Sequence, residues 1–212
     1  MWPLLQLAKR RCSVSKKSFF IGQFRLLWRF LGFFQPPGMR LLHAMVAALA
    51  ITQYLTGLGA HAGSAYKGVL SALCTDWHII AGLSLFALVQ ALAFSSLQHR
   101  GLRVLFPYLW GDIARLKEDL AATLRGKLVP PKPGGLAACV QGLGLGALLL
   151  AVYSGLAWFV AWLFDLPVRR PLIELHKTLV PLVGLYALGH GGMALTHFVI
   201  WQRKMNNAAS RT

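Results

Sequence analysis

Acidic residues are scarce in this chain: it has 6 aspartates and glutamates against 22 lysines and arginines among 212 residues. The six acids are peripheral, and no Ser/His/Asp or HExxH arrangement accompanies them, which argues against conventional hydrolytic catalysis. Cysteine is scarce too. The three cysteines form no CxxC pattern, so no disulfide framework is indicated.

Charged residues of either sign are also few, since they make up 13% of the chain whereas hydrophobic residues make up 56%. Four stretches carry no Lys, Arg, Asp or Glu at all: 41–66, 77–99, 133–164 and 178–202. Each is long enough for a membrane-spanning helix of about 20 residues. The connections are too short for separate domains. We therefore predict an all-α, integral membrane four-helix bundle.

The basic residues are concentrated on one side of the predicted spans. Eight lie in 1–40, seven in 100–132 and three in 203–212, whereas the other side has four: Lys67, Arg169, Arg170 and Lys177. This bias follows the positive-inside rule and predicts that both termini lie on the cytoplasmic side of a bacterial inner membrane. The excess of positive charge then indicates contact with anionic membrane lipid and not with nucleic acid.

Two segments outside the spans have helical patterns of their own. In 19–34, Arg25 and Arg29 stand among aromatic residues, which predicts an interfacial amphipathic helix that anchors the chain or offers a docking surface for a partner. Segment 111–127 has Asp112 early and basic residues late, as suits a helix dipole, and predicts a short cytoplasmic loop helix. The predicted organisation is an N-terminal extension (1–38), a membrane domain (39–203) and a tail (204–212).

Glycines gather on the third and fourth spans. Gly142, Gly144 and Gly146 follow no strand, so they do not form a nucleotide-binding loop, and the Gly142–Gly146 pair favours close helix approach. A second group lies around position 190, where it either makes room for a flat cofactor or serves ordinary helix contact: Gly184, Gly189, Gly191 and Gly192.

Four of the seven histidines fall at two depths of the predicted bundle, and a histidine in hydrocarbon is rare and costly. With both termini inside, His78 and His176 lie near the outer surface, and His43 and His190 lie deeper toward the cytoplasm. His176 and His190 are fourteen residues apart, so they share one helix face roughly 21 Å apart. We predict an outer pair, His78 with His176, and an inner pair, His43 with His190.

Two stacked pairs of imidazoles inside a bundle suit two b-type haems, which are held by axial ligands alone. No CxxCH motif is present for covalent attachment. His197, two turns beyond His190, is the alternative inner ligand; otherwise it would lie near a haem propionate or a quinone. His61 and His99 are expected at the membrane interfaces.

The histidines stand in motifs that resemble the bacterial cytochrome b561 and nickel-hydrogenase cytochrome b family. Its first helix resembles the segment from Arg40-Leu-Leu-His43 to Thr56-Gly57, and its second resembles His78-Ile-Ile-Ala-Gly82. Its fourth helix resembles His176 and His190 followed by Ala194-Leu-Thr-His197-Phe198. The resemblance covers 39–203. It implies that the four matching histidines ligate two b haems and that electrons pass between quinone and a partner or oxidant.

The leading functional hypothesis is a dihaem cytochrome that carries electrons between the quinone pool and a redox partner or a small oxidant. Such a protein would be the electron-transfer component of a quinone-linked oxidoreductase. The partner could be a dehydrogenase, a hydrogenase or a cytochrome c. One alternative is the cytochrome b anchor subunit of a periplasmic dehydrogenase or hydrogenase complex. Another, from a different class, is a haem-free four-helix transporter or assembly factor.

Overall fold

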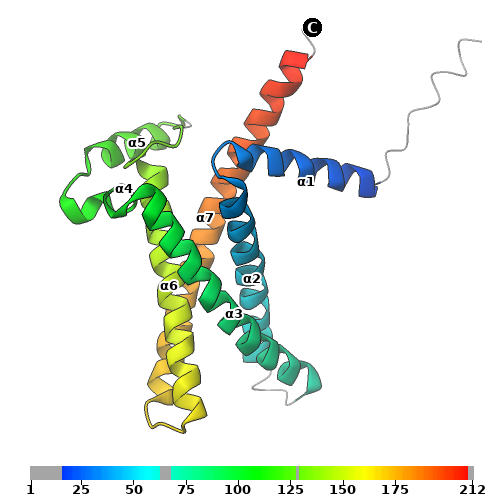
Figure 1. Cartoon of the computed structure of the whole chain (residues 1–212), viewed down its shortest axis with the longest axis vertical. Coiled ribbons are helices and arrows are strands. Elements are labelled where there is room, and N and C mark those ends of the chain that lie inside the picture. Colours follow the sequence, from blue (N-terminus) through cyan, green and yellow to red (C-terminus); the bar gives the residue numbers. More distant parts are fainter. Residues whose placement is uncertain (1–15, 63–67, 128, 210–212) are drawn as a thin grey trace, which may run out of the picture. The chain divides into compact units, whose positions relative to one another are not determined.

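The computed structural model describes residues 16–62, 68–127 and 129–209, and all regular secondary structure in these ranges is helical. The chain divides into two compact units: unit 1 combines residues up to Arg40 with those from Phe198 onward, and unit 2 is Leu41–His197. The elements in chain order are α1 Lys16–Gly32, α2 Pro37–Ala62, α3 Val69–Arg100, α4 Leu102–Leu105, η1 Pro107–Trp110, α5 Ala114–Leu124, α6 Leu136–Leu163 and α7 Arg169–Ala209 (Figure 1).

Four of the described helices, α2, α3, α6 and α7, are long and apolar enough to cross a membrane, which confirms the predicted spans. Helices α3 and α7 begin earlier than predicted, at Val69 and Arg169, and so include Asp76 and Glu174. A charge-free stretch ends where the chain meets water or headgroups. A helix can continue past that point, because its backbone hydrogen bonds are internal and do not depend on the surrounding solvent.

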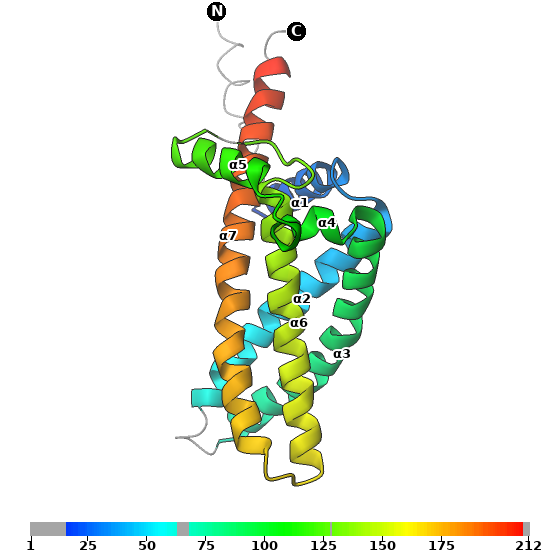
Figure 2. The ribbon, with the colours of Figure 1, turned by 90° about the vertical axis from the view of Figure 1, so that its left-hand side faces the viewer.

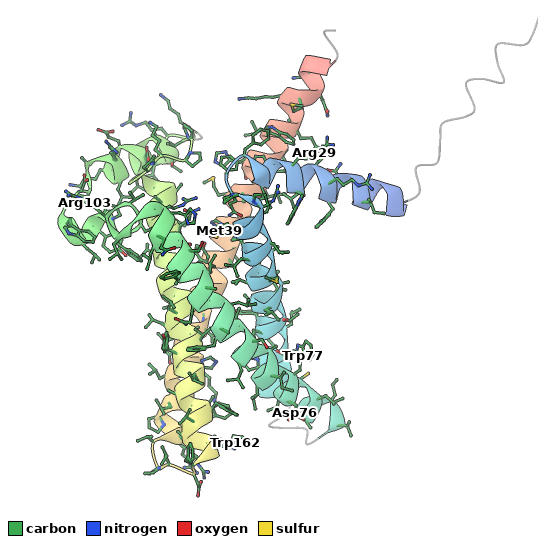
Figure 3. The ribbon with its side chains drawn as sticks, in the orientation of Figure 1. Arg29, Met39, Asp76, Trp77, Arg103 and Trp162 are labelled. Atoms are coloured by element: carbon green, nitrogen blue, oxygen red, sulfur yellow. The ribbon has the colours of Figure 1, made fainter. Side chains whose placement is uncertain are left out.

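In unit 2 the four long helices form an antiparallel bundle (Figures 1 and 2). Among the described residues the most extensive backbone packing joins α3 to α6. Val46 of α2 and Leu85 and Val89 of α3 form a buried cluster. Figure 3 places Trp77 and Trp162 at one end of the bundle, where both are half-exposed, as tryptophans at a membrane interface commonly are.

The segment between α3 and α6 contains more structure than the sequence predicted. The expected loop helix is α5, but α4 and the 3-10 helix η1 were not predicted, because elements of four residues are too short to show a periodicity. Leu105 and Pro107 anchor this segment and are almost fully buried. A Cβ atom on Gly142 of α6 would lie 2.2 Å from the Leu105 carbonyl oxygen, so glycine permits this contact.

The predicted dipole partner of α5 was wrong. Asp112 lies before the helix, and the first turn of α5 has no acidic residue. The carboxylate that meets a helix start belongs to Asp119, whose Oδ2 accepts a hydrogen bond of 3.0 Å from the backbone N–H of Leu136. Asp119 is 8% exposed, so this charge-assisted bond is sheltered at the positive end of α6.

We expect Asp119→Ala to lower the free energy of unfolding by about 1 kcal/mol, the usual cost of removing a helix cap. The measurement is thermal unfolding of the purified protein in detergent, followed by circular dichroism. Asp112→Ala is the control, because Asp112 is exposed and precedes α5. Equal melting temperatures for the two variants would contradict the capping role of Asp119.

Unit 1 is held together by aromatic side chains. The Phe30 ring lies 5.6 Å from that of Phe198 and 5.6 Å from that of Trp201, between ring centres. The Arg40 guanidinium donates to the Trp28 carbonyl oxygen and lies 4.4 Å from the centre of the Trp28 ring. Helix α1 ends at Gly32, two residues before the predicted end, because Phe33 and Phe34 lie in the turn that leads to Pro37.

Candidate functional site: two facing histidine pairs

The structure brings the four predicted histidines together as two pairs within unit 2. His78 of α3 faces His176 of α7, with ring centres 6.4 Å apart and ring planes at 77°. His43 of α2 faces His190 of α7, with ring centres 6.1 Å apart and ring planes at 59°. Helix α7 therefore contributes one histidine to each pair.

These spacings match what one iron between two imidazoles requires. A metal–imidazole nitrogen bond is about 2 Å long and the nitrogen lies ~1.1 Å from the ring centre, so two rings on opposite sides of an iron have centres ~6.2 Å apart. The observed distances are 6.1 and 6.4 Å. A pair of imidazoles is also the right number of donors for an iron whose other four ligands come from a porphyrin. The residues present fit two b-type haems.

The outer histidine of α3 is oriented by a hydroxyl group of α2. Thr56 Oγ1 donates to the Thr52 carbonyl oxygen at 2.8 Å and lies 3.1 Å from His78 Nδ1. Since the hydroxyl proton is already directed at a carbonyl, the threonine oxygen accepts from the imidazole, and Nδ1 carries the proton. Nε2 of His78 then has the lone pair that an iron would bind.

The outer histidine of α7 is oriented in the same way by α6. His176 Nδ1 lies 3.1 Å from Ser154 Oγ and 3.1 Å from the Ala151 carbonyl oxygen. A carbonyl can only accept, so Nδ1 of His176 is the protonated nitrogen and Nε2 is the potential iron ligand. Ser154 itself donates to the Ala151 carbonyl at 3.0 Å.

Glycines touch both outer imidazoles. A Cβ atom on Gly57 would lie 3.3 Å from Cε1 of His78, and one on Gly155 would lie 3.1 Å from Cε1 of His176. Both distances are tighter than ordinary carbon–carbon contact. A larger residue at either position would press on the ring, so glycine lets α2 and α6 approach the histidines closely.

The inner pair is supported by an aromatic ring. Tyr186, one turn before His190, stacks on its imidazole with ring centres 5.1 Å apart and planes at 20°. The other neighbour of the tyrosine ring is Gly144 of α6, where a Cβ atom would lie 2.1 Å from Cε2. The order of contact is therefore Gly144, Tyr186, His190 and His43.

The glycine predictions have a mixed outcome. Gly142 does serve close approach, but a Cβ atom on Gly146 would meet nothing within 4 Å, so the predicted GxxxG contact was wrong for its second glycine. Around His190, a Cβ atom on Gly184 would lie 3.0 Å from Tyr54. Helix contact does not explain the rest, because a Cβ atom would meet no atom within 4 Å at Gly189, Gly191 or Gly192.

The remaining histidines lie apart from the two pairs. His197 is about 10 Å beyond His190 along α7 and only partly buried, and the ring that faces His43 is that of His190. His99 is exposed, and its Nδ1 lies 2.8 Å from the Ser95 carbonyl oxygen, one turn back in α3. The side chain of His61 lies outside the described part of the chain.

Sequence reasoning missed the residues that hold the histidines. Tyr186 could have been found from its position four residues before His190, because residues four apart share a helix face. Ser154 and Gly155 could have been found because they repeat the Thr56-Gly57 pattern on another span. Neither signal says which histidine the residue would contact, and that required the structure.

Four membrane-crossing helices with two facing histidine pairs at two depths define a class: multi-pass membrane proteins that bind two haems between their helices. The sequence pattern of the family described as prokaryotic cytochrome b561 matches residues 35–207, and the chain belongs to that family. The protein is thus a membrane dihaem b-type electron-transfer cytochrome. Comparisons with curated proteins and with solved structures found no match.

Family membership confirms the predicted resemblance, and the matched range agrees closely with the 39–203 inferred from motifs. It also decides against the haem-free transporter or assembly factor, because the family carries b-type haems.

Proposed function

We propose that His78 and His176 are the axial ligands of an outer haem and that His43 and His190 are those of an inner haem. The ring-centre distances of 6.4 and 6.1 Å carry this assignment. The tautomers inferred at His78 and His176 support it, since in both the unprotonated Nε2 has the lone pair that an iron would bind. When bound, the haem irons supply reversible one-electron oxidation and reduction, and the protein supplies ligation, burial and hydrogen bonding.

Helix α7 sets the distance over which electrons cross the bundle. Its two histidines are fourteen residues apart, which is roughly 21 Å along a helix. Because both belong to one helix, α7, their separation is set within a single element, in which Pro181 lacks one backbone hydrogen-bond donor, and not by how separate helices pack. The apolar side chains of α2 and α3 between the two levels, including Val46, Leu85 and Val89, keep water out of this region.

We further propose that the protein exchanges electrons with the quinone pool and passes them to a redox partner or a small oxidant. The connection between α6 and α7 is short, from Leu163 to Arg169, so the described structure has no outer catalytic domain there. A small diffusible oxidant or a separate dehydrogenase, hydrogenase or cytochrome c would complete the reaction. The anchor-subunit function is the second candidate, and a separate periplasmic subunit would then supply the catalytic domain that the short α6–α7 connection does not provide.

The proposed setting is a bacterial inner membrane with both termini in the cytoplasm. The basic residues of 100–132 lie at the end of the bundle that carries α4, where Figure 3 labels Arg103, and Trp77 and Trp162 lie at the opposite end. This is the charge asymmetry of the positive-inside rule. Helix α1 exposes Ile21, Phe24 and Leu27 beside Arg25 and Arg29, which suits insertion among anionic headgroups.

The experiment is a dithionite-reduced minus oxidised absorption spectrum of the purified protein, combined with haem quantitation. We expect the bands of b-type haem at two haems per chain. Reduction by a quinol should then show whether the isolated protein uses quinone, and copurification of a large metalloprotein would favour the anchor-subunit function. A haem-to-chain ratio of one or less in fully loaded protein would contradict the assignment of two pairs.

A further inference from the structure

The two hairpins that carry the outer histidines are built alike. In α2–α3, the Thr56-Gly57 dipeptide faces His78; in α6–α7, the Ser154-Gly155 dipeptide faces His176. The hydroxyl residue precedes its histidine by 22 residues in both hairpins. The same chemical pattern at the same spacing occurs on two different helix pairs.

The local geometry repeats as well as the spacing. The hydroxyl oxygen lies 3.1 Å from Nδ1 in both cases, and each hydroxyl donates to a carbonyl of its own helix, at 2.8 Å for Thr56 and 3.0 Å for Ser154. Each following glycine lies against Cε1 of the same ring. Each imidazole is thus held at Nδ1 by an acceptor and approached at Cε1 by the backbone of a glycine, where a Cβ atom would lie 3.3 Å (Gly57) or 3.1 Å (Gly155) from the ring.

The inner pair is supported by different means. His190 stacks on Tyr186, whose ring packs against Gly144, and the hydroxyl–glycine dipeptides lie at the level of the outer pair. A change to either dipeptide should therefore act on one of the two histidine pairs.

We propose that Thr56-Gly57 and Ser154-Gly155 are a matched pair of clamps that fix the tautomer and the rotation of the outer histidines and thereby lower the reduction potential of the outer haem. The inference rests on the proposed ligation by His78 and His176. An imidazole whose Nδ1–H donates to an oxygen is a more basic ligand at Nε2. A more basic ligand stabilises ferric iron over ferrous iron, so loss of the acceptor should raise the potential. Thr56 and Ser154 are positioning residues, since they act through the histidines.

Thr56→Val tests the clamp, because valine has the shape of threonine without the hydroxyl, and Thr56→Ser is the matched variant that keeps the hydroxyl. The readout is a potentiometric titration of the two haems, which should give one redox transition, or wave, for each haem. The wave that is lost in a His78→Ala variant is assigned to the outer haem. For Thr56→Val we expect ferric binding to weaken about tenfold relative to ferrous binding, which is ~59 mV for a one-electron couple. Ser154→Ala should give a shift in the same direction but smaller, because the Ala151 carbonyl oxygen, 3.1 Å from His176 Nδ1, still accepts from the imidazole. The outer wave should move to higher potential and the inner wave should stay in place.

Ser84→Ala is the control for loss of a hydroxyl on a membrane helix, because Ser84 donates to the Ile80 carbonyl oxygen within α3. It should leave both waves unchanged. Loss of the outer haem in Thr56→Val, with a normal outer haem in Thr56→Ser, would also support the clamp. Equal behaviour of Thr56→Val and Thr56→Ser would overturn it, as would an unchanged outer wave in Thr56→Val.

The His78→Ala variant separates the proposed ligation from the proposed clamp. If His78→Ala keeps both haems, the proposed ligation is wrong and the clamp falls with it. If His78→Ala loses one haem but neither Thr56→Val nor Ser154→Ala shifts the outer wave, the ligation stands and the clamp alone is wrong.

Discussion

Replacing His78 or His176 with alanine is expected to remove one haem and leave the other, so that the haem-to-chain ratio falls from two to one. The two imidazoles face each other at 6.4 Å between ring centres, and on the proposed ligation the loss of either would leave the outer haem held by a single histidine. Haem bound without covalent attachment depends on those ligands. The ratio is measured by haem extraction and protein quantitation, and the reduced spectrum should keep the bands of the inner haem.

The same measurement distinguishes the two possible inner ligands. His190→Ala and His43→Ala should each remove the inner haem, because their rings are 6.1 Å apart. His197→Ala and His99→Ala are the controls and should retain two haems, since neither ring belongs to a facing pair. Loss of a haem in His197→Ala but not in His190→Ala would reverse the assignment and show that α7 is used in a different register.

Gly144→Ala is expected to cost stability and to disturb the inner haem, although alanine normally favours a helix. Its Cβ atom would lie 2.1 Å from Cε2 of Tyr186, and the ring that must move is the one stacked on His190. Overpacking of this kind costs about 1–3 kcal/mol, against a gain of about 0.5–1 kcal/mol for replacing a helical glycine. We expect a lower melting temperature and a shifted or depleted inner haem.

Gly146→Ala is the matched control, two residues further along the same helix. A Cβ atom there meets nothing within 4 Å, so the helical gain should remain without the steric cost. The two variants should therefore move the melting temperature in opposite directions. If Gly144→Ala is as stable as Gly146→Ala and keeps a normal inner haem, then Tyr186 does not position His190.

The sequence predicted the membrane spans because hydrocarbon tolerates few charges, so a run without Lys, Arg, Asp or Glu marks a span directly. It did not predict where the helices end. Helix α3 begins at Val69 and takes in Asp76, since the backbone continues through the interface region. Nor did it predict α4 and η1, in which Leu105 and Pro107 are buried and the Leu105 carbonyl lies against Gly142 of α6. Such contacts between distant segments leave no periodic pattern in the sequence.

The candidate site was predictable in part, because polar residues stand out in the apolar sequence of a membrane helix. Histidine is conspicuous in an apolar helix, and the rise per residue placed His176 and His190 on one face. The groups around them are not conspicuous. Serine, threonine, tyrosine and glycine are all tolerated in membrane helices. The residue types of Ser154, Gly144 and Tyr186 therefore do not show that these residues position the histidines.

The sequence by itself determined the number of spans, the charge asymmetry, the four histidines at two depths and the membership in the cytochrome b561 family, because each depends on residue type and position along one helix. The tertiary structure decided which ring faces His43, which nitrogen of the outer histidines carries the proton, and which glycines are required by contact. These features depend on atoms from two or three helices meeting within a few ångströms, and only the packing of the bundle determines such distances.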